Sequence, residues 1–175
     1  MAPRQGPRGE CGPWHDPGVG SSENGAGTAR LDVTEWSGYL LVTPLVLCLA
    51  GVGLLPAYAA QEFAERAAIA WGAVLLAGGG AVHWGLALAG RLSPPRAGFA
   101  AALSAALAAA AALLLGGQRG LALLVVAGGG FWLYEHRALG TQLPPAYLNL
   151  RRHIALASGL LLALTMFVAD AAGLG

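Results

Sequence analysis

The octet GGGAVHWG at residues 78–85 lies inside an apolar stretch that runs from Ala67 to Gly90. A helix of ~20 apolar residues crosses a hydrocarbon core of ~30 Å, so this stretch predicts a transmembrane helix. His83 is the only ionisable side chain in the stretch. Because ionisable groups inside a membrane are candidates for function, the octet is the first place to look for a site.

The composition of the whole chain indicates the same class of protein. Its 175 residues are 56% hydrophobic and 11% charged, whereas an ordinary soluble domain has roughly 25% charged residues. The formal net charge of +1 gives no basic field for nucleic acid, so no nucleic-acid partner is expected. All ten basic side chains are arginine, a composition that favours a bacterial source.

Five apolar stretches predict an all-α fold, a polytopic membrane bundle of five transmembrane helices. The expected spans are residues 36–55, 67–90, 97–115, 120–134 and 153–169. A proline inside a span is tolerated where a neighbouring helix satisfies the freed carbonyl, so Pro44 predicts a kink packed against protein. Residues 61–66 are expected to form a polar turn, and the longest polar connection is expected from Glu135 to Arg152.

The segments outside the spans set the orientation. Residues 1–35 are rich in Gly and Pro and have no periodic apolar pattern, which predicts a disordered cytoplasmic tail. Residues 171–175 are expected to form a short carboxy-terminal tail. The arginines near span ends are unequally divided, with Arg66 and Arg119 on one side and Arg30, Arg91, Arg96, Arg137, Arg151 and Arg152 on the other. By the positive-inside rule the amino terminus is cytoplasmic, in a multi-pass protein of the bacterial inner membrane.

Small side chains surround His83 on its own predicted helix. Residues four apart lie on the same face of a helix. One face of this helix therefore has a ridge of small residues, which lets another helix approach closely and consists of Ala77, Ala81, Gly85 and Ala89. Beside that ridge, Gly79 and Gly80 lie on the face of His83, which predicts a side chain that faces protein and not lipid. Two uses of His83 stay open, an interhelical hydrogen bond that fixes register and a contact with a ligand or cofactor.

Polar residues outside the octet give weaker signals. A group that falls toward the cytoplasmic side consists of His83, Glu135, His136, Arg151, Arg152 and His153. A charged loop is ordinarily solvated, and although His83 and His153 could ligate a haem axially, no spacing requires it. No Asp or Glu lies within the predicted spans, which argues against a carboxylate proton relay. No nucleophile–base pair, phosphate loop or zinc spacing is present, so neither an enzyme, a cofactor nor a metal site is expected.

Two runs of the chain are similar to a known family. GGAVHWGLA at residues 79–87 and PAYLNLRR at residues 145–152 resemble the small bacterial and mitochondrial membrane family that contains transmembrane protein 69, over about residues 38–167. That family has no known function. The resemblance therefore implies the five-span fold and singles out His83, Trp84 and Arg151, but it implies no activity.

The sequence favours a non-enzymatic accessory or assembly subunit of an inner-membrane complex, because it has small-residue ridges and no catalytic set. The expected partners are the lipid bilayer and either another membrane protein or a second copy of the chain. The alternatives are a small carrier or channel that uses His83 and the Gly-rich helices, and a haem-binding redox subunit. The candidate functional or helix-packing residues are His83, Trp84, Gly79, Gly80, Gly85 and Arg151.

Overall fold

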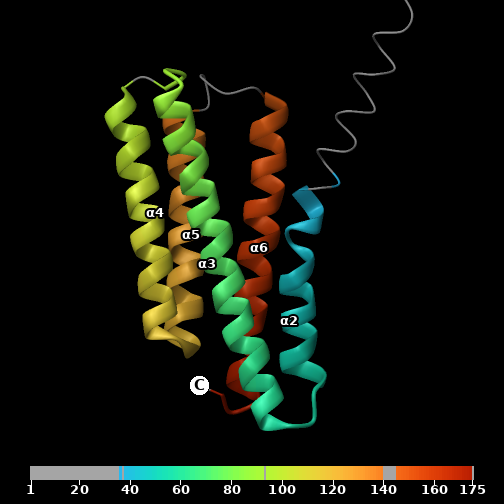
Figure 1. The fold of residues 1–175 in the computed structure, drawn as a ribbon. Helices are drawn as coiled ribbons and strands as arrows, with labels where there is room; N and C mark the ends of the chain where they lie inside the picture. Colours follow the sequence, from blue (N-terminus) through green and yellow to red (C-terminus); the bar gives the residue numbers. More distant parts are fainter. Residues whose placement is uncertain (1–35, 37, 93, 140–144, 175) are drawn as a thin grey trace, which may run out of the picture. The chain divides into compact units, whose positions relative to one another are not determined.

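The computed structural model describes residues 36, 38–92, 94–139 and 145–174, so the predicted tail at residues 1–35 lies outside the described residues. The helices of the described part are α2 (Thr43–Leu54), α3 (Tyr58–Leu88), α4 (Pro95–Leu115), α5 (Gly117–Leu139) and α6 (Pro145–Ala171). Consecutive helices run in opposite directions along one bundle (Figure 1). The all-α prediction is confirmed.

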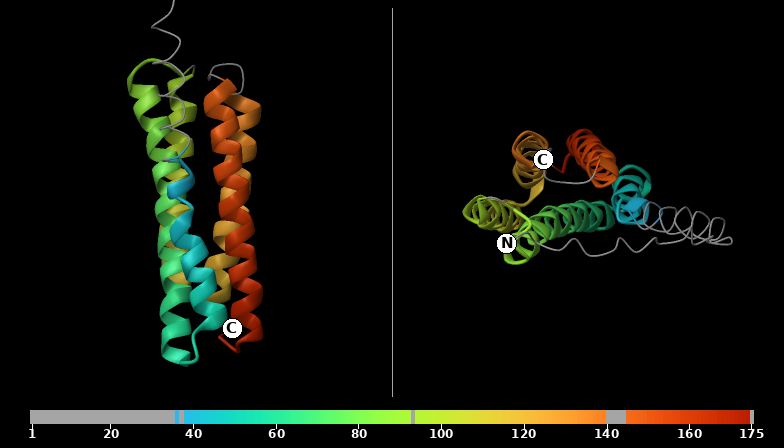
Figure 2. Two further views of the ribbon diagram at one scale, coloured as in Figure 1. Left: turned by 90° about the vertical axis from the view of Figure 1, so that its right-hand side faces the viewer. Right: turned by 90° about the horizontal axis from the view of Figure 1, so that it is seen from above.

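Helix α3 is the centre of this bundle, because it alone among the described helices packs against all of the others. Seen along the bundle axis, α3 and α4 form one row and α5 and α6 a second, with α2 beside α3 and α6 (Figure 2). The main apolar core lies between the rows and includes Ile69, Leu76, Leu121, Leu124 and Leu162. Any polar side chain that α3 directs inward therefore enters the middle of the bundle.

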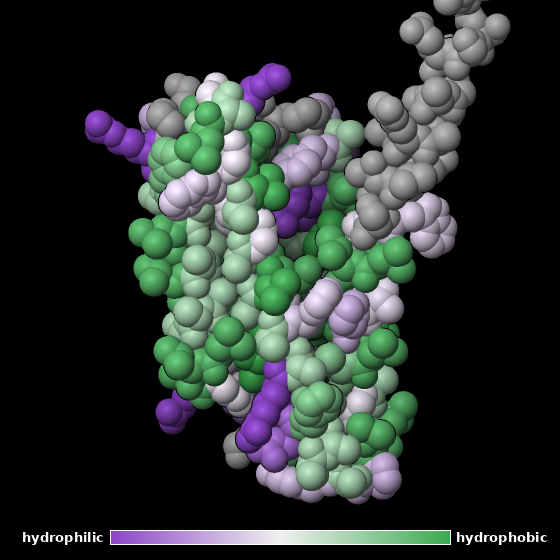
Figure 3. Space-filling view, viewed as in Figure 1, coloured by the Kyte–Doolittle hydropathy of each residue, from purple (hydrophilic) through white to green (hydrophobic). Residues whose placement is uncertain are grey.

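Much of the outer surface is apolar. Leu54 and Leu114 are 81% and 88% exposed, and hydrophilic residues gather toward the two ends of the face in Figure 3. Three helical segments are long and apolar enough to cross a membrane, namely Tyr58–Leu88, Arg96–Leu115 and Pro145–Ala171, while the apolar helix Gly38–Leu54 is shorter. By length and composition, these three helices are suited to crossing a membrane.

The helices extend past the polar residues at which the predicted spans end. Helix α3 begins at Tyr58, so the predicted turn at residues 61–66 is wrong, and Arg66 there donates to Glu62 one turn earlier at 2.6 Å. Helix α5 continues to Leu139 and not only to residue 134. Helix α6 begins at Pro145, where the first helical position needs no N–H donor. The predicted long connection from Glu135 to Arg152 is therefore wrong, and both residues are helical.

These longer helices bring acidic groups into the bundle. Glu65 of α3 and Glu135 of α5 are only 4% and 2% exposed. Glu65 lies just before the predicted span 67–90, and Glu135 lies just after the predicted span 120–134. Both were left out because a charged residue lowers the mean hydropathy at the end of a span. The expectation that carboxylates stay outside the apolar helices is wrong for these two positions.

The first apolar stretch is broken near Pro44, as predicted. Residues 38–40 are helical, Leu41 and Val42 form a turn, and α2 starts at Thr43 with the proline in its first turn. The Leu45 amide donates to the Val42 carbonyl at 3.0 Å, which leaves the Leu41 carbonyl without its usual donor four residues later. The Trp71 indole of α3 donates to that carbonyl at 2.8 Å, so a neighbouring helix satisfies the break.

Candidate functional site

Four polar side chains meet between α3, α5 and α6, and they are called the buried cluster below. The buried cluster consists of His83 from α3, Glu135 from α5, and Tyr147 and Arg151 from α6. Tyr147 and Arg151 are four residues apart, so one face of α6 presents both to Glu135. His83 is fully buried, which confirms that it faces protein.

Glu135 is the acceptor at the centre of the buried cluster. The Arg151 Nε lies 3.3 Å from each carboxylate oxygen, and the Tyr147 hydroxyl donates to Oε1 at 3.4 Å. A buried carboxylate is costly unless opposite charge and hydrogen bonds compensate it, and these two groups supply both. The ion pair therefore joins α5 to α6 inside the bundle.

His83 has one satisfied and one unsatisfied ring nitrogen. Its Nδ1 lies 3.0 Å from the Gly79 carbonyl, which can only accept, so Nδ1 carries the hydrogen. In the neutral ring, Nε2 then has a bare lone pair. It lies 3.7 Å from Glu135 Oε1 and has no hydrogen-bond partner among the described residues. A lone pair facing a carboxylate leaves room for one proton between the two groups.

The guanidinium of Arg151 engages Glu135 through Nε and leaves its outer edge free of the carboxylate. Both terminal nitrogens lie against Gly79, in the space that a side chain there would fill. The guanidinium carbon lies 5.9 Å above the centre of the Phe131 ring, and His83 meets the same ring edge-on at 5.1 Å. The Arg151 side chain remains 21% exposed, so the buried cluster is not fully closed off from the surface.

The glycines of the octet have different surroundings. An added Cβ at Gly80 would lie 2.9 Å from the Ala105 Cβ and 3.1 Å from the Ala102 carbonyl, so Gly80 permits close contact of α3 with α4. Gly85 meets nothing within 4 Å. The ridge that contains Gly85 is exposed at Ala81, Gly85 and Ala89, so no described helix packs on it. Within this chain the close approach predicted on that ridge occurs on the face of Gly79 and Gly80.

The other polar or aromatic candidates lie outside the buried cluster. Trp84 is 48% exposed and meets Phe99 of α4 edge-on at 5.1 Å. His136 is exposed and stacks on Trp132, and Arg152 and His153 are exposed on α6. Since His83 is buried and His153 is exposed, the geometry offers no support for the pair as haem ligands. Across residues 36–174, where described, no group of three or more His, Cys, Asp or Glu side chains could hold a metal.

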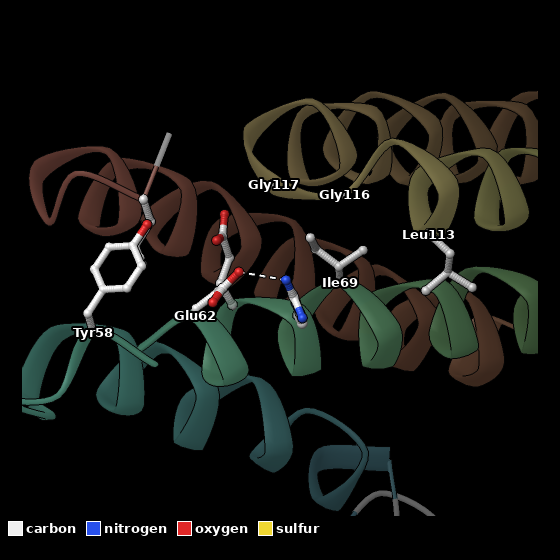
Figure 4. Close-up of a pocket in the computed structure, with 9 residues that line it drawn as sticks. Tyr58, Glu62, Ile69, Leu113, Gly116 and Gly117 are labelled. Atoms are coloured by element: carbon white, nitrogen blue, oxygen red, sulfur yellow. Dashed lines mark hydrogen bonds and ion pairs between the residues drawn. The ribbon is translucent and has the colours of Figure 1, made fainter. Parts of the chain in front are cut away.

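A separate pocket of about 380 Å³ lies where α3 begins and α4 ends (Figure 4). Its walls include Tyr58, Glu62, Glu65, Ile69 and Leu113. Glu62 is already paired with Arg66, and the buried Oε1 of Glu65 has no described partner. The pocket thus offers one unpaired carboxyl group, whereas the buried cluster joins four polar groups from three helices. The candidate functional site is therefore the buried cluster.

Sequence reasoning grouped His83, Glu135 and Arg151 toward the cytoplasmic side, although it treated the charged residues as a solvated loop. It named Gly79 on the face of His83 but missed Phe131 and Tyr147. The four-residue spacing of Tyr147 and Arg151 is a signal for a shared helical face, provided that the helix begins at Pro145. Glu135 directly follows the predicted fourth span, so one further residue of helix would have included it. The sequence did not indicate that α5 continues past residue 134 or that α6 begins at Pro145.

The fold and the buried cluster together define a class, an all-α protein with membrane-type helices and an ionic group inside its bundle. Residues 33–167 match the family described as "Protein of unknown function (DUF3429)", and the chain belongs to that family. Membership in a family of unknown function is thus confirmed, whereas the link to transmembrane protein 69 stays a resemblance. No curated protein and no solved structure matches the chain.

Proposed function

We propose that the bundle crosses the bacterial inner membrane five times and that the end holding the buried cluster faces the cytoplasm. Exposed arginines support this orientation, because Arg91, Arg96, Arg137 and Arg152 lie at that end and Arg66 and Arg119 at the other. Helix α5 has 23 residues, which is long enough for a hydrocarbon core of ~30 Å. Residues 38–54 cross it with the break near Pro44, where the open carbonyl of Leu41 accepts a hydrogen bond from the Trp71 indole.

In this orientation the buried cluster lies below the membrane surface. The Arg151 guanidinium packs on Gly79, and the adjacent Gly80 packs on Ala102 of α4. Ala102 follows Arg96, the start of the apolar part of α4, by six residues, which is ~9 Å along a helix. A guanidinium and a carboxylate at this depth are costly to maintain, and such groups in membranes ordinarily serve ions, protons or substrates.

We further propose that the protein is a small, non-enzymatic carrier of an anion, with the buried cluster as its binding site. The observation that carries this proposal is the incomplete pairing of the cluster, since His83 Nε2 and the outer edge of Arg151 are left without partners among the described residues. A network that served only to lock the helices together is expected to satisfy its polar groups. No nucleophilic Ser, Cys or Lys belongs to the cluster, which supports transport over chemistry.

Uptake by proteoliposomes tests the carrier proposal. The full chain is reconstituted, and uptake of radiolabelled pyruvate, succinate and inorganic phosphate is compared with that of empty vesicles. At least one of these anions is expected to enter in a protein-dependent way. His83→Gln is expected to lower the uptake rate by about tenfold or more, because the buried Glu135 loses its charged partner at position 83. His136→Gln changes an exposed histidine and is expected to keep the wild-type uptake rate. Protein-independent uptake of all three anions would contradict the proposal.

A second candidate function, the accessory subunit of a membrane complex, is favoured by the exposed ridge on α3. Ala81, Gly85 and Ala89 leave room for another helix, and Trp84 is half-exposed beside them. The partner would be another membrane protein or a second copy of the chain. Under this alternative, a defined partner copurifies in mild detergent, and Gly85→Leu releases it without changing the folded chain. A monomer without partner at all detergent concentrations would contradict it.

A further inference from the structure

We infer that the buried cluster binds one proton and one small oxyanion together. The proton lies between His83 Nε2 and Glu135 Oε1, and the anion lies at the outer edge of the Arg151 guanidinium beside Gly79. The inference rests on the proposed function, because it names the substrate class and the coupled ion of the same site. Four features of the buried cluster support it, namely the direction of the His83 hydrogen bond, the free edge of Arg151, the net charge and the neighbouring groups.

The hydrogen-bond direction of His83 leaves a place for the proton. The Gly79 carbonyl fixes the hydrogen on Nδ1, so in the neutral ring Nε2 can only accept. The atom that Nε2 faces, Glu135 Oε1 at 3.7 Å, is also an acceptor when ionised. Two acceptors 3.7 Å apart repel each other in a dry interior, and a single proton on either atom replaces that repulsion with an attraction, which a small approach of the two side chains turns into a hydrogen bond. In the inferred site the two groups share this one proton.

The outer edge of Arg151 supplies the anion site. Because Nε already holds Glu135, the two terminal nitrogens remain for a ligand, and their fork fits a carboxylate or phosphate oxygen pair. Gly79 has no side chain to cover them, and the neighbouring Gly78 meets nothing within 4 Å. Figure 3 shows one hydrophilic patch in the upper half of this face and a second one in its lower half. The exposed part of the Arg151 side chain is where an anion approaches in the inferred site.

The charges of the buried cluster couple the two ligands. Without the extra proton, Arg151 and Glu135 neutralise each other; with it, the cluster has one net positive charge in a low-dielectric environment. A monovalent anion beside Arg151 restores neutrality, so each ligand increases the affinity for the other. A shared site of this kind moves a proton and an anion in the same direction.

Among the described residues around the pair, the charged neighbour is Arg151, which holds Glu135. From α6, Arg151 and Tyr147 face the pair, and from α4 the contact at the His83 backbone is Gly98. From α5, Phe131 packs on the His83 ring. Tyr134 of the same helix packs against the small apolar cluster that contains Ala87, one turn after His83. The buried Tyr134 hydroxyl has no partner among the described residues. Among the described residues, α2 places no ionisable side chain on the pair. The proton is therefore assigned to His83 and Glu135.

Pyruvate binding as a function of pH tests this inference. The full chain is placed in phosphatidylcholine nanodiscs, and its affinity for pyruvate is measured between about pH 6 and 8, where histidine chemistry is accessible and pyruvate stays ionised. Binding one proton with each anion predicts that affinity falls by up to about tenfold per unit of rising pH. His136→Gln and Arg152→Gln are matched controls that keep both the affinity and the slope.

Three variants separate the parts of the site. His83→Gln removes the proton acceptor, so the slope is lost and the weak, high-pH affinity remains. Glu135→Gln frees Arg151 from its carboxylate, so pyruvate binds at least as tightly as to the wild type at low pH, without a slope. Arg151→Gln lowers the affinity by more than about tenfold at every pH. At high pH, Glu135→Gln raises the pyruvate affinity above that of the wild type, whereas His83→Gln leaves it at the wild-type value; a loss of folding cannot raise the affinity.

Discs of phosphatidylglycerol distinguish the two sources of an oxyanion. If a lipid phosphate is the natural occupant, these discs lower the pyruvate affinity of the wild type, and the lipid copurifies with the wild type but not with Arg151→Gln. A pH-independent affinity in the wild type, or a slope that survives both His83→Gln and Glu135→Gln, would overturn the inference. If the protein transports anions but its pyruvate affinity does not depend on pH, the carrier proposal stands and the proton–anion inference is wrong. If the affinity depends on pH but no anion is transported, only the carrier proposal is contradicted.

Discussion

The terminal nitrogens of Arg151 occupy the space that a side chain at Gly79 would fill. This contact brings α6 against α3 at the level where His83 donates to the Gly79 carbonyl. A single glycine thus serves two members of the buried cluster, Arg151 through its missing side chain and His83 through its carbonyl. The octet matters to the fold because it makes room for a group from another helix.

Gly79→Ala is expected to harm binding more than stability. The new methyl group would displace the end of a flexible side chain, so the free energy of unfolding changes by at most about 1 kcal/mol. Pyruvate affinity falls by about tenfold or more, because the terminal nitrogens shift away from the anion while Nε keeps its contact with Glu135. Gly78→Ala is the matched control: it points into open space and raises stability by about 0.5–1 kcal/mol. Thermal unfolding and pyruvate binding measure the two effects, and equal behaviour of both variants would contradict the role of Gly79.

Gly80→Ala is expected to destabilise the bundle. Its methyl group meets backbone atoms of Ala102, which cannot rotate away, so α3 and α4 must separate at a cost of about 1–3 kcal/mol. Gly85→Ala lies one and a half turns further along α3 in open space and is expected to be neutral or stabilising. Guanidinium unfolding in detergent compares the two. An unchanged midpoint for Gly80→Ala would contradict the close helix contact.

Glu135 and Arg151 are expected to be energetically coupled. Breaking a buried ion pair from one side leaves an uncompensated charge, so Glu135→Gln and Arg151→Gln each destabilise by about 3 kcal/mol. The double variant removes both charges and loses less than the sum, with a coupling energy of about 1–3 kcal/mol. Glu62 and Arg66, an exposed pair on α3, provide the control cycle, where the coupling is below about 0.5 kcal/mol. Additive losses at Glu135 and Arg151 would show that the pair is not formed.

The proposed orientation predicts which ends of the helices accept an impermeant thiol reagent. In intact cells of a variant without Cys11 and Cys48, a cysteine at Arg119 is labelled from outside, and a cysteine at Arg91 is labelled only after the membrane is opened. The reason is the excess of arginine at the Arg91 end. Labelling of both positions from outside would exclude a single orientation with the buried cluster toward the cytoplasm.

Hydropathy located the helices because burial in lipid and burial in protein both select apolar side chains. It failed at the helix ends, since a helix continues as long as its backbone hydrogen bonds are satisfied, whatever the polarity of its side chains. Glu65 and Glu135 are charged residues on continuous helices, and both were assigned to connections. The predicted break at Pro44 succeeded because the missing N–H of proline is a local property.

The face of α3 that packs inward was harder to predict. Ala77, Ala81, Gly85 and Ala89 form one stripe of small residues, and Gly79, Gly80 and Ala87 flank His83 on another. Both stripes permit close approach, and residue size alone does not rank them. The buried position of His83 selects the second stripe, because a polar ring needs partners that lipid cannot supply. Its hydrogen-bond acceptor Gly79 lies on the same helix, but Phe131 and Glu135 come from α5, which the sequence of α3 alone cannot reveal.

The comparison of Arg151→Gln with Arg152→Gln in proteoliposomes tests the central claim most directly. The two arginines are neighbours in sequence, yet one belongs to the buried cluster and the other is exposed. Protein-dependent anion uptake is expected to fall by about tenfold or more in Arg151→Gln and to stay within about twofold of the wild type in Arg152→Gln. Equal rates in the two variants would contradict the assignment of the buried cluster as the functional site.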